Sequence, residues 1–365
     1  MHGQLLLLGV PGTELTPEDA ALYQSIQPGG FVLFGRNVES PEQLRKLTDD
    51  LRDLCETTPV ISIDQEGGRV SRTKKIGATP PSAKELCDKN DLGLIAQHGK
   101  LTAFLLRILG FNMNLCPVLD ISYDDHTDNA MRGRCYGTDA QQVITNAGIF
   151  NRNLRHCNIL SSGKHFPSCG LADIDPHHDL PHVAKSVDEM LASDLLPYTA
   201  LMPELDSLMS CHVHFSAIDP DSPGLPGSFS RNLLTHLLRN QLGYEGVIIT
   251  DDLDMGAITK TYGRGPDVKL AIEAGNDMAM ICHQPTTAPV AINHLKELPH
   301  HRIDDALRRV EKLKKKLYVP LPYSTELWDK IDKDITKLRI DVLGAEHAQK
   351  TIDDSGEARS PVEDY

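Results

Sequence analysis

A stretch of twenty residues, KHFPSCGLADIDPHHDLPHV at positions 164 to 183, concentrates imidazole and carboxylate side chains. Its prolines and glycine break any helix, so we expect it to form a loop. Within it, Asp175 stands two residues before His177, a spacing at which a carboxylate can hold one imidazole nitrogen and direct the other toward a substrate. The segment favours general acid–base chemistry. Two alternatives remain. The segment can be an ordinary polar loop exposed to solvent, or it can hold zinc, although the sequence has no HExxH motif and no HxH at a first strand end.

A second segment, EGVIITDDLDMGAI at positions 245 to 258, carries a β-branched strand into three aspartates. Asp251 stands where the strand ends, and a rigid carboxylate there is what a retaining glycosidase needs to attack an anomeric carbon. A helix cap is the structural alternative, and Asp252 or Asp254 can take that part.

The third segment, ISIDQEGGRVSR at positions 61 to 72, places Asp64 and two arginines around a Gly-Gly turn. A carboxylate accepts hydrogen bonds and a guanidinium donates them in fixed geometry, a combination that suits sugar hydroxyls. By itself the turn carries little information.

Eight short apolar runs separated by amphipathic stretches supply the elements that would position these residues. Continuous apolar runs between helices are typical of parallel strands that are buried on both faces. The alternation predicts a single-domain (β/α)8 barrel of the TIM type. An open, doubly wound sheet usually has fewer strands, and no GxGxxG follows the first run. The predicted strands are Leu5–Gly9, Gly30–Phe34, Val60–Asp64, Phe111–Asp120, Ile159–His165, Ser207–His212, Gly246–Asp251 and Met278–Cys282.

Polar side chains fall at the carboxyl ends of these runs, which is the face where barrel enzymes build their active sites. Five strands ending in charged or imidazole groups would be costly in a purely structural core. The residues are Asp64, Asp120, Lys164 with His165, His212, and Asp251 with Asp252.

Capping signals mark several of the intervening helices. Boxes that begin at Ser40, Thr138 and Ser186 each open a predicted helix. The barrel pattern covers residues 1–322. Residues 323–351 have helical spacing of apolar side chains and are expected to pack outside the barrel, and the acidic tail 352–365 is expected to be disordered.

The composition of the chain limits the classes of partner that it is expected to bind. The chain has 365 residues, 51 acidic against 37 basic, and a formal charge of −14, which argues against nucleic acid and anionic membranes as partners. No run approaches the ~20 apolar residues of a membrane span. The Leu5–Leu8 run is too short for a secretory signal, and eight scattered cysteines suit a reducing compartment, so a cytoplasmic location is expected.

Taken together, the three segments resemble the family-three glycoside hydrolases, specifically the single-domain β-N-acetylglucosaminidases of bacterial cell-wall recycling. The family pattern DQEGGRVxR matches residues 64–72 without a gap. The pattern KHFPGxG followed after four residues by DxH matches residues 164–177, and GV-apolar-apolar-[ST]-D-x-L-x-M matches residues 246–255. PVLD at 117–120 and AGxDM at 274–278 also match, so the resemblance covers roughly residues 4–320.

This resemblance implies a role for each matched residue. Asp251 would be the nucleophile, and His177, held by Asp175, the general acid/base. The residues implied in sugar binding are Asp64, Arg72, Arg134, Lys164 and His165. It implies no metal and no cofactor, a small glycoside as the partner, and peptidoglycan fragments as the source of that glycoside. We expect a monomer, since no association element is visible.

The sequence departs from the family at Ser168, Cys169 and Pro176, where glycine, histidine and serine are usual. Proline fixes φ, so the loop is expected to be stiffer than in relatives. Three alternatives stay open: a phosphorylase that uses the same site, a metal-dependent barrel hydrolase, and a non-catalytic sugar-binding relative.

Overall fold

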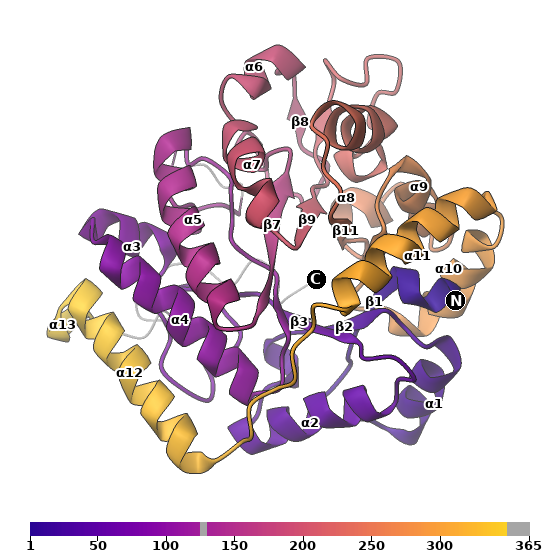
Figure 1. Ribbon diagram of the computed structural model, residues 1–365. Coiled ribbons are helices and arrows are strands. Elements are labelled where there is room, and N and C mark those ends of the chain that lie inside the picture. Colours follow the sequence, from indigo (N-terminus) through magenta and orange to yellow (C-terminus); the bar gives the residue numbers. More distant parts are fainter. Residues whose placement is uncertain (125–129, 349–365) are drawn as a thin grey trace.

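Eight parallel strands close into a barrel in the computed structural model, which describes residues 1–124 and 130–348. Their order around the barrel is β1-β12-β11-β9-β7-β6-β3-β2. Figure 1 shows the strands at the centre of a ring of helices, as a TIM-type barrel requires. The predicted fold class is thereby confirmed. The bounds are β1 Leu6–Gly9, β2 Gly30–Leu33, β3 Val60–Ile63, β6 Met113–Asn114, β7 Leu160–Phe166, β9 Ser207–Ser210, β11 Val247–Asp252 and β12 Met278–Ile281.

The strands form where apolar and β-branched residues run together, because helices cover them outside and side chains fill the barrel inside. β1 and β2 are buried along their whole length. Seven of the eight predicted runs agree with the observed strands to within two residues at either end.

The fourth predicted strand, 111–120, is wrong in extent. Only Met113–Asn114 is regular, and beyond it a single bridge joins Val118 to Lys164. Pro117 has no N–H to give to a ladder, so the chain leaves regular pairing there. It stays beside β7 all the same, because Ser162 and Lys164 donate to the carbonyls of Cys116 and Pro117 at 3.1 Å each.

Two small sheets stand apart from the barrel and escaped the sequence prediction. β4 (Gln65–Gly67) and β5 (Val70–Ser71) form an antiparallel hairpin directly after β3. β8 (His182–Val183) pairs in parallel with β10 (His214–Phe215). Each sheet fixes one of the loops that leave the carboxyl end of the barrel.

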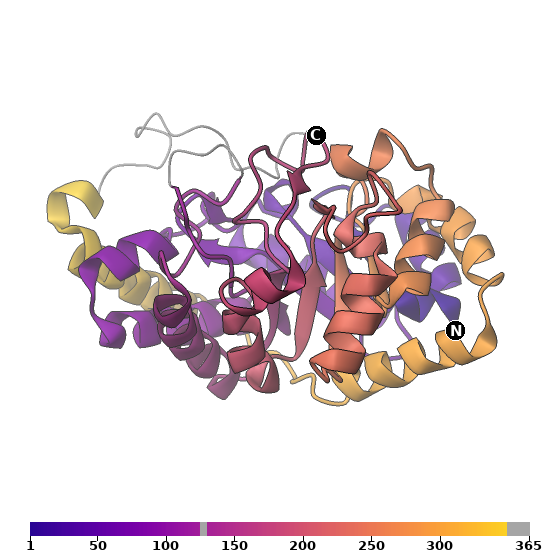
Figure 2. The ribbon, with the colours of Figure 1, turned by 90° about the horizontal axis from the view of Figure 1, so that it is seen from above.

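Helices surround the barrel and close its amino-terminal end. Three long ones are α4 (Leu92–Ile108), α5 (Ala140–His156) and α11 (His300–Lys314), and Figure 2 shows α11 lying below the barrel. The others are α1 Pro17–Ile26, α2 Pro41–Asp53, α3 Ala83–Lys89, α6 Val187–Leu191, α7 Leu196–Leu201, a π-helix at Asn232–Gln241, α8 Gly256–Thr259, α9 Pro266–Ala274 and α10 Ala288–Leu295.

The capping predictions hold in two of three cases. Ser40 and Ser186 each cap their helix with a complete capping box. The box predicted at Thr138 is wrong by one residue, because Asp139 is the N-cap and its carboxylate accepts from the N–H of Gln142 at 2.9 Å.

After the barrel, α12 (Thr325–Leu343) lies against α4 on the outside of the molecule, followed by the short α13 (Ala345–Ala348). The inner face of α12 buries Trp328, Ile331, Ile335 and Leu338. The division into 1–322 and 323–351 stays a prediction. The predicted acidic tail, 352–365, lies outside the described residues.

All eight cysteines lie within the described residues, and none of them forms a disulfide. Among the described residues, no helix has both the length and the apolar character that crossing a membrane requires.

Candidate active site

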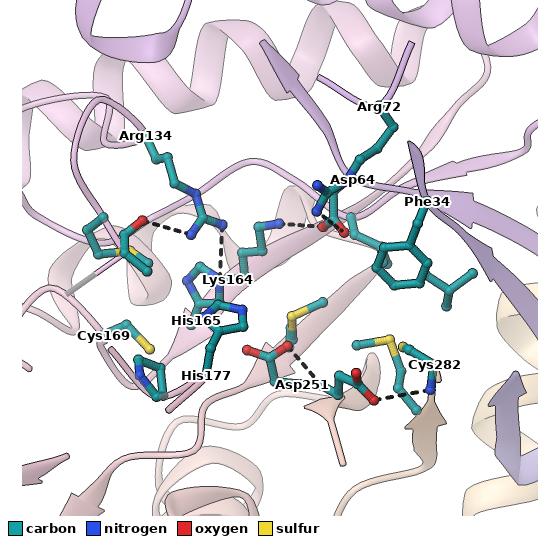
Figure 3. Close-up of a pocket in the computed structure, with 18 residues that line it drawn as sticks. Phe34, Asp64, Arg72, Arg134, Lys164, His165, Cys169, His177, Asp251 and Cys282 are labelled. Carbon is teal, nitrogen blue, oxygen red and sulfur yellow. Dashed lines mark hydrogen bonds and ion pairs between the residues drawn. The ribbon is translucent and has the colours of Figure 1, made fainter. Parts of the chain in front are cut away.

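A pocket opens at the carboxyl ends of the barrel strands and gathers the predicted site residues (Figure 3). It has an empty volume of about 540 Å³, part of it open to solvent. Seven predicted residues line it, and Asp175 stands directly behind His177. The seven are Asp64, Arg72, Arg134, Lys164, His165, His177 and Asp251.

The turn after β3 places Asp64 and Arg72 on opposite legs of a hairpin. Gly67 and Gly68 make the turn with φ of 103° and 56°, a conformation that side chains other than glycine rarely adopt. A Cβ on Gly67 would also lie 2.2 Å from a backbone oxygen. The turn closes tightly and brings Nη2 of Arg72 to 3.5 Å from Oδ2 of Asp64.

Lys164, at the end of β7, bridges two buried carboxylates. Its Nζ lies 2.7 Å from Oδ1 of Asp64 and 2.6 Å from Oε1 of Glu66. Arg134 holds the same Glu66 in a bidentate pair, with both contacts at 2.8 Å. Burial would lower the pKa of Lys164, but Asp64 and Glu66 outweigh burial and raise it. The cluster therefore keeps its charges fixed at one wall of the pocket.

His165 is oriented by Asp120, which follows the irregular stretch after β6. Nδ1 of His165 lies 2.7 Å from Oδ2 of Asp120. An ionised carboxylate only accepts hydrogen bonds, so Nδ1 carries the proton. Nε2 then faces Nη2 of Arg134 at 3.5 Å.

Asp175 and His177 form the pair that their spacing predicts. Nδ1 of His177 lies 2.5 Å from Oδ1 of Asp175, and the same oxygen accepts from the His177 N–H at 2.9 Å. Burial would raise the pKa of Asp175, but the hydrogen bond from His177 dominates and lowers it. The ionised carboxylate therefore holds Nδ1 protonated and leaves Nε2 for proton transfer.

The three aspartates at the end of β11 have different surroundings. Oδ1 of Asp252 accepts from the N–H groups of Asp254 and Cys282, and Oδ2 of Asp254 accepts from those of His283 and Gln284. These two carboxylates tie β11 to the segment after β12. The helix cap that the sequence suggested for them is wrong, because Met255 is the N-cap of the following helix, Gly256–Thr259, and no side chain caps it.

Asp251 and Asp252 both line the pocket, and Figure 3 shows Asp251 beside His165 and His177. Burial would raise the pKa of Asp251, but the imidazoles around it, that of His165 first, outweigh burial and lower the pKa. The carboxylate is ionised at neutral pH, as a nucleophile must be.

The matches to known proteins agree with this geometry. A model of the glycosyl hydrolase family 3 N-terminal domain matches residues 2–313. The chain belongs to glycosyl hydrolase family 3. A β-hexosaminidase of Pseudomonas aeruginosa is 34% identical over 300 residues, which are 82% of this chain and 88% of that protein. A β-hexosaminidase of Bordetella avium is 31% identical over 337 residues, 90% of this chain and 91% of that one.

Solved structures of family 3 enzymes share the fold. A family 3 β-N-acetylglucosaminidase from Paenibacillus superposes with a TM-score of 0.85 at 30% identity, covering 93% of this chain and 67% of that one. NagZ from Neisseria gonorrhoeae has a TM-score of 0.78 at 24% identity, covering 92% and 97%. The predicted family and enzyme class, a β-N-acetylhexosaminidase, are confirmed.

Sequence reasoning missed two charged residues of this family 3 site. Glu66 lies inside the matched motif, yet only its acid neighbour Asp64 was predicted to take part. Asp120 was counted as a strand end and given no role. The available signal was the same for both: a buried lysine and a buried histidine need carboxylate partners, and these acids stand at neighbouring strand ends.

Phe34 was missed as well, and His212 was counted as a strand end and given no role. Phe34 lines the pocket, with the guanidinium carbon of Arg72 5.6 Å from its ring centre. His212 lies behind the nucleophile. Its Nε2 is 2.9 Å from the carbonyl oxygen of Asp252, and its Nδ1 is 2.8 Å from Oγ of Ser228.

The residues that depart from the family pattern lie close to the Asp175–His177 pair. Cys169 and Pro176 line the pocket, and the N–H of Cys169 donates to Oδ1 of Asp120 at 2.6 Å. Ser168 is buried. Cys169 thus joins the wall that carries His165.

Residues 1–124 and 130–348 contain no group of three or more His, Cys, Asp or Glu side chains arranged to hold a metal. The metal-dependent alternative gains no support from that part of the chain.

Proposed function

We propose that the chain is a retaining exo-β-N-acetylglucosaminidase that hydrolyses a terminal, non-reducing β-linked N-acetylglucosamine. Asp251 is the nucleophile in this proposal, and His177, oriented by Asp175, is the general acid/base. The observation that carries it is the meeting of an ionised strand-end carboxylate and an Asp–His pair in one pocket.

The reaction proceeds by two displacements. In the first, Asp251 attacks the anomeric carbon and the glycosidic bond breaks, while Nε2 of His177 gives its proton to the departing oxygen. In the second, Nε2 takes a proton from water, and the resulting hydroxide displaces the carboxylate of Asp251. Asp175 stabilises the positive charge that His177 carries before it donates the first proton and again after it takes the second. Between these two steps the imidazole is neutral, and in neither form does it repel the anionic nucleophile as a second carboxylate would.

We assign sugar recognition to the charged residues along one wall of the pocket. The carboxylate of Asp64 accepts hydrogen bonds from sugar hydroxyls, and Arg72 and Lys164 donate them. His165 and Arg134 extend the same wall, with Arg134 also holding Glu66 in place. Apolar side chains of the barrel strands form the floor, including Val32, Met209 and Met280.

The family resemblance suggests the wider setting. The substrate in this proposal is a small muropeptide or disaccharide from peptidoglycan, the enzyme acts as a monomer, and it works in the cytoplasm.

A panel of chromogenic β-glycosides tests the proposal. Turnover of the aryl β-N-acetylglucosaminide should exceed that of the β-glucoside and should be unaffected by chelator or inorganic phosphate. Equal or faster turnover of the β-glucoside would remove the assigned specificity. Dependence on phosphate would replace the hydrolase by a phosphorylase, and loss on chelation would point to a metal.

A further inference from the structure

The loop that carries His177 is fixed at both ends. At the β7 end, Oδ1 of Asp120 accepts from the N–H groups of Cys169 and Gly170. At the other end, β8 pairs with β10. His177 lies between these anchors, so a third contact is needed to hold it at a set distance from Asp251.

That third contact comes from the turn after the nucleophile. The N–H of Gly256 donates to the carbonyl of His177 at 3.0 Å, and the N–H of Ala257 donates to that of Pro176 at 3.3 Å. These two donors open α8, which begins five residues after Asp251. First-turn amides have no partner inside their own helix, so they are available to bind another segment. The backbone that bears the acid/base is thus hydrogen-bonded to the segment that bears the nucleophile.

The contact is too close for a side chain at position 256. A Cβ on Gly256 would lie 2.7 Å from the carbonyl oxygens of both His177 and His178. Both obstacles are backbone atoms, which cannot rotate away. Gly256 is not among the residues with positive φ, so an alanine there would meet no backbone penalty of its own. The requirement for glycine is therefore one of distance between the two segments.

We propose that Gly256 is a positioning residue that sets the distance between His177 and Asp251. The inference rests on the proposed function, because it gives meaning to that distance. Proton transfer and nucleophilic attack must act on one glycosidic bond, and a misplacement of ~1 Å can cost on the order of 10²-fold in rate. The ion pair between Lys260 and Asp179, 3.0 Å apart and exposed, joins the same segments but contributes little.

The test compares Gly256→Ala with Gly263→Ala. Gly263 is exposed, lies seven residues further along, and has nothing within 4 Å of the position that a Cβ would take, so it controls for the loss of a glycine. We expect kcat/KM of Gly256→Ala to fall by roughly 10- to 100-fold on a methyl or phenyl β-N-acetylglucosaminide, and by less than about 3-fold on the 2,4-dinitrophenyl glycoside. Gly263→Ala should match the wild type on both, and the Tm of each variant is measured alongside.

His177→Ala separates this inference from the proposed function. If His177→Ala itself shows no dependence on the leaving group, the acid/base assignment fails. If His177→Ala shows that dependence while Gly256→Ala retains wild-type rates, or loses all substrates equally together with a lowered Tm, the positioning role of Gly256 is wrong. Should Gly256→Ala fail to fold, Ala257→Pro disturbs the same contact without a Cβ at position 256, because it removes the 3.3 Å hydrogen bond and sets a ring carbon against the carbonyl of Pro176. It should show the same preference for good leaving groups, and equal losses on all substrates would reject the inference.

Discussion

Asp120 holds both the ring and the backbone of His165. Its Oδ2 lies 2.7 Å from Nδ1 of the imidazole and accepts from the His165 N–H at 3.1 Å. Its Oδ1 accepts from the N–H groups of Cys169 and Gly170 at 2.6 and 3.2 Å. One carboxylate therefore fixes the end of β7 and the first turn of the catalytic loop.

Because each of these groups around Asp120 is a donor, Asp120→Asn should be harmful although it changes only one atom. The new amide N–H must face another N–H, and a buried donor left without an acceptor costs about 1–3 kcal/mol. We expect a lower Tm and a raised KM for the β-N-acetylglucosaminide. Asp179→Asn, at an exposed position in the same loop, is the control and should leave both unchanged. Equal behaviour of the two variants would contradict the role assigned to Asp120.

Glu66 should link stability to pH. Burial would raise the pKa of Glu66, but Arg134 and Lys164 outweigh burial and hold it far below its usual range. A carboxyl group whose pKa is lowered by folding contributes stability above its unfolded pKa, about 4.3, and loses it as the pH falls toward the folded pKa. Glu66→Gln should therefore lose stability at pH 7 and show a shallower loss on acidification than the wild type. Urea unfolding between pH 3 and pH 7 measures this, and parallel curves for the two proteins would refute it.

His177→Ala should harm substrates with poor leaving groups far more than activated aryl glycosides. General acid–base catalysis contributes about 10²–10⁴-fold, and a good phenolate departs almost without it. Deglycosylation still needs the base, so the variant should release a burst of phenol and be partly rescued by azide. Asp175→Asn should give a weaker form of the same pattern, because it disturbs the imidazole without removing it.

His178 is the matched control for that experiment. It is adjacent to His177 and has the same side chain, but the family pattern assigns the acid/base to His177. If His178→Ala proves more damaging than His177→Ala on a disaccharide substrate, the assignment of the loop is in the wrong register.

The sequence predicted the barrel and most of the pocket because both depend on local patterns. Apolar runs and strand-end polar residues are visible one segment at a time. The strand predicted at 111–120 was too long because Pro117 interrupts a run that is otherwise strand-like. The partners of the buried charged residues were harder to predict. Lys164 contacts Asp64 although 100 residues separate them in the sequence, and Glu66 joins the same cluster.

Gly256 illustrates a different limit. In the sequence it is an ordinary glycine after a methionine, compatible with a helix start or a turn. Glycine is required at this position because the loop from β7 to β8 packs against α8. That packing places carbonyl oxygens 2.7 Å from the position that a Cβ would take. Close approach between distant segments leaves no local pattern to find.

In the proposed mechanism Asp251, and neither of its acidic neighbours, forms the glycosyl-enzyme. Incubation with a 5-fluoro derivative of N-acetylglucosaminyl fluoride, followed by peptide mapping by mass spectrometry, tests this assignment directly. We predict a single label on Asp251, and no label in Asp251→Ala, which should remain folded while turnover falls by ~10⁴-fold or more. Recovery of the label on Asp252 or Asp254 would contradict the assignment.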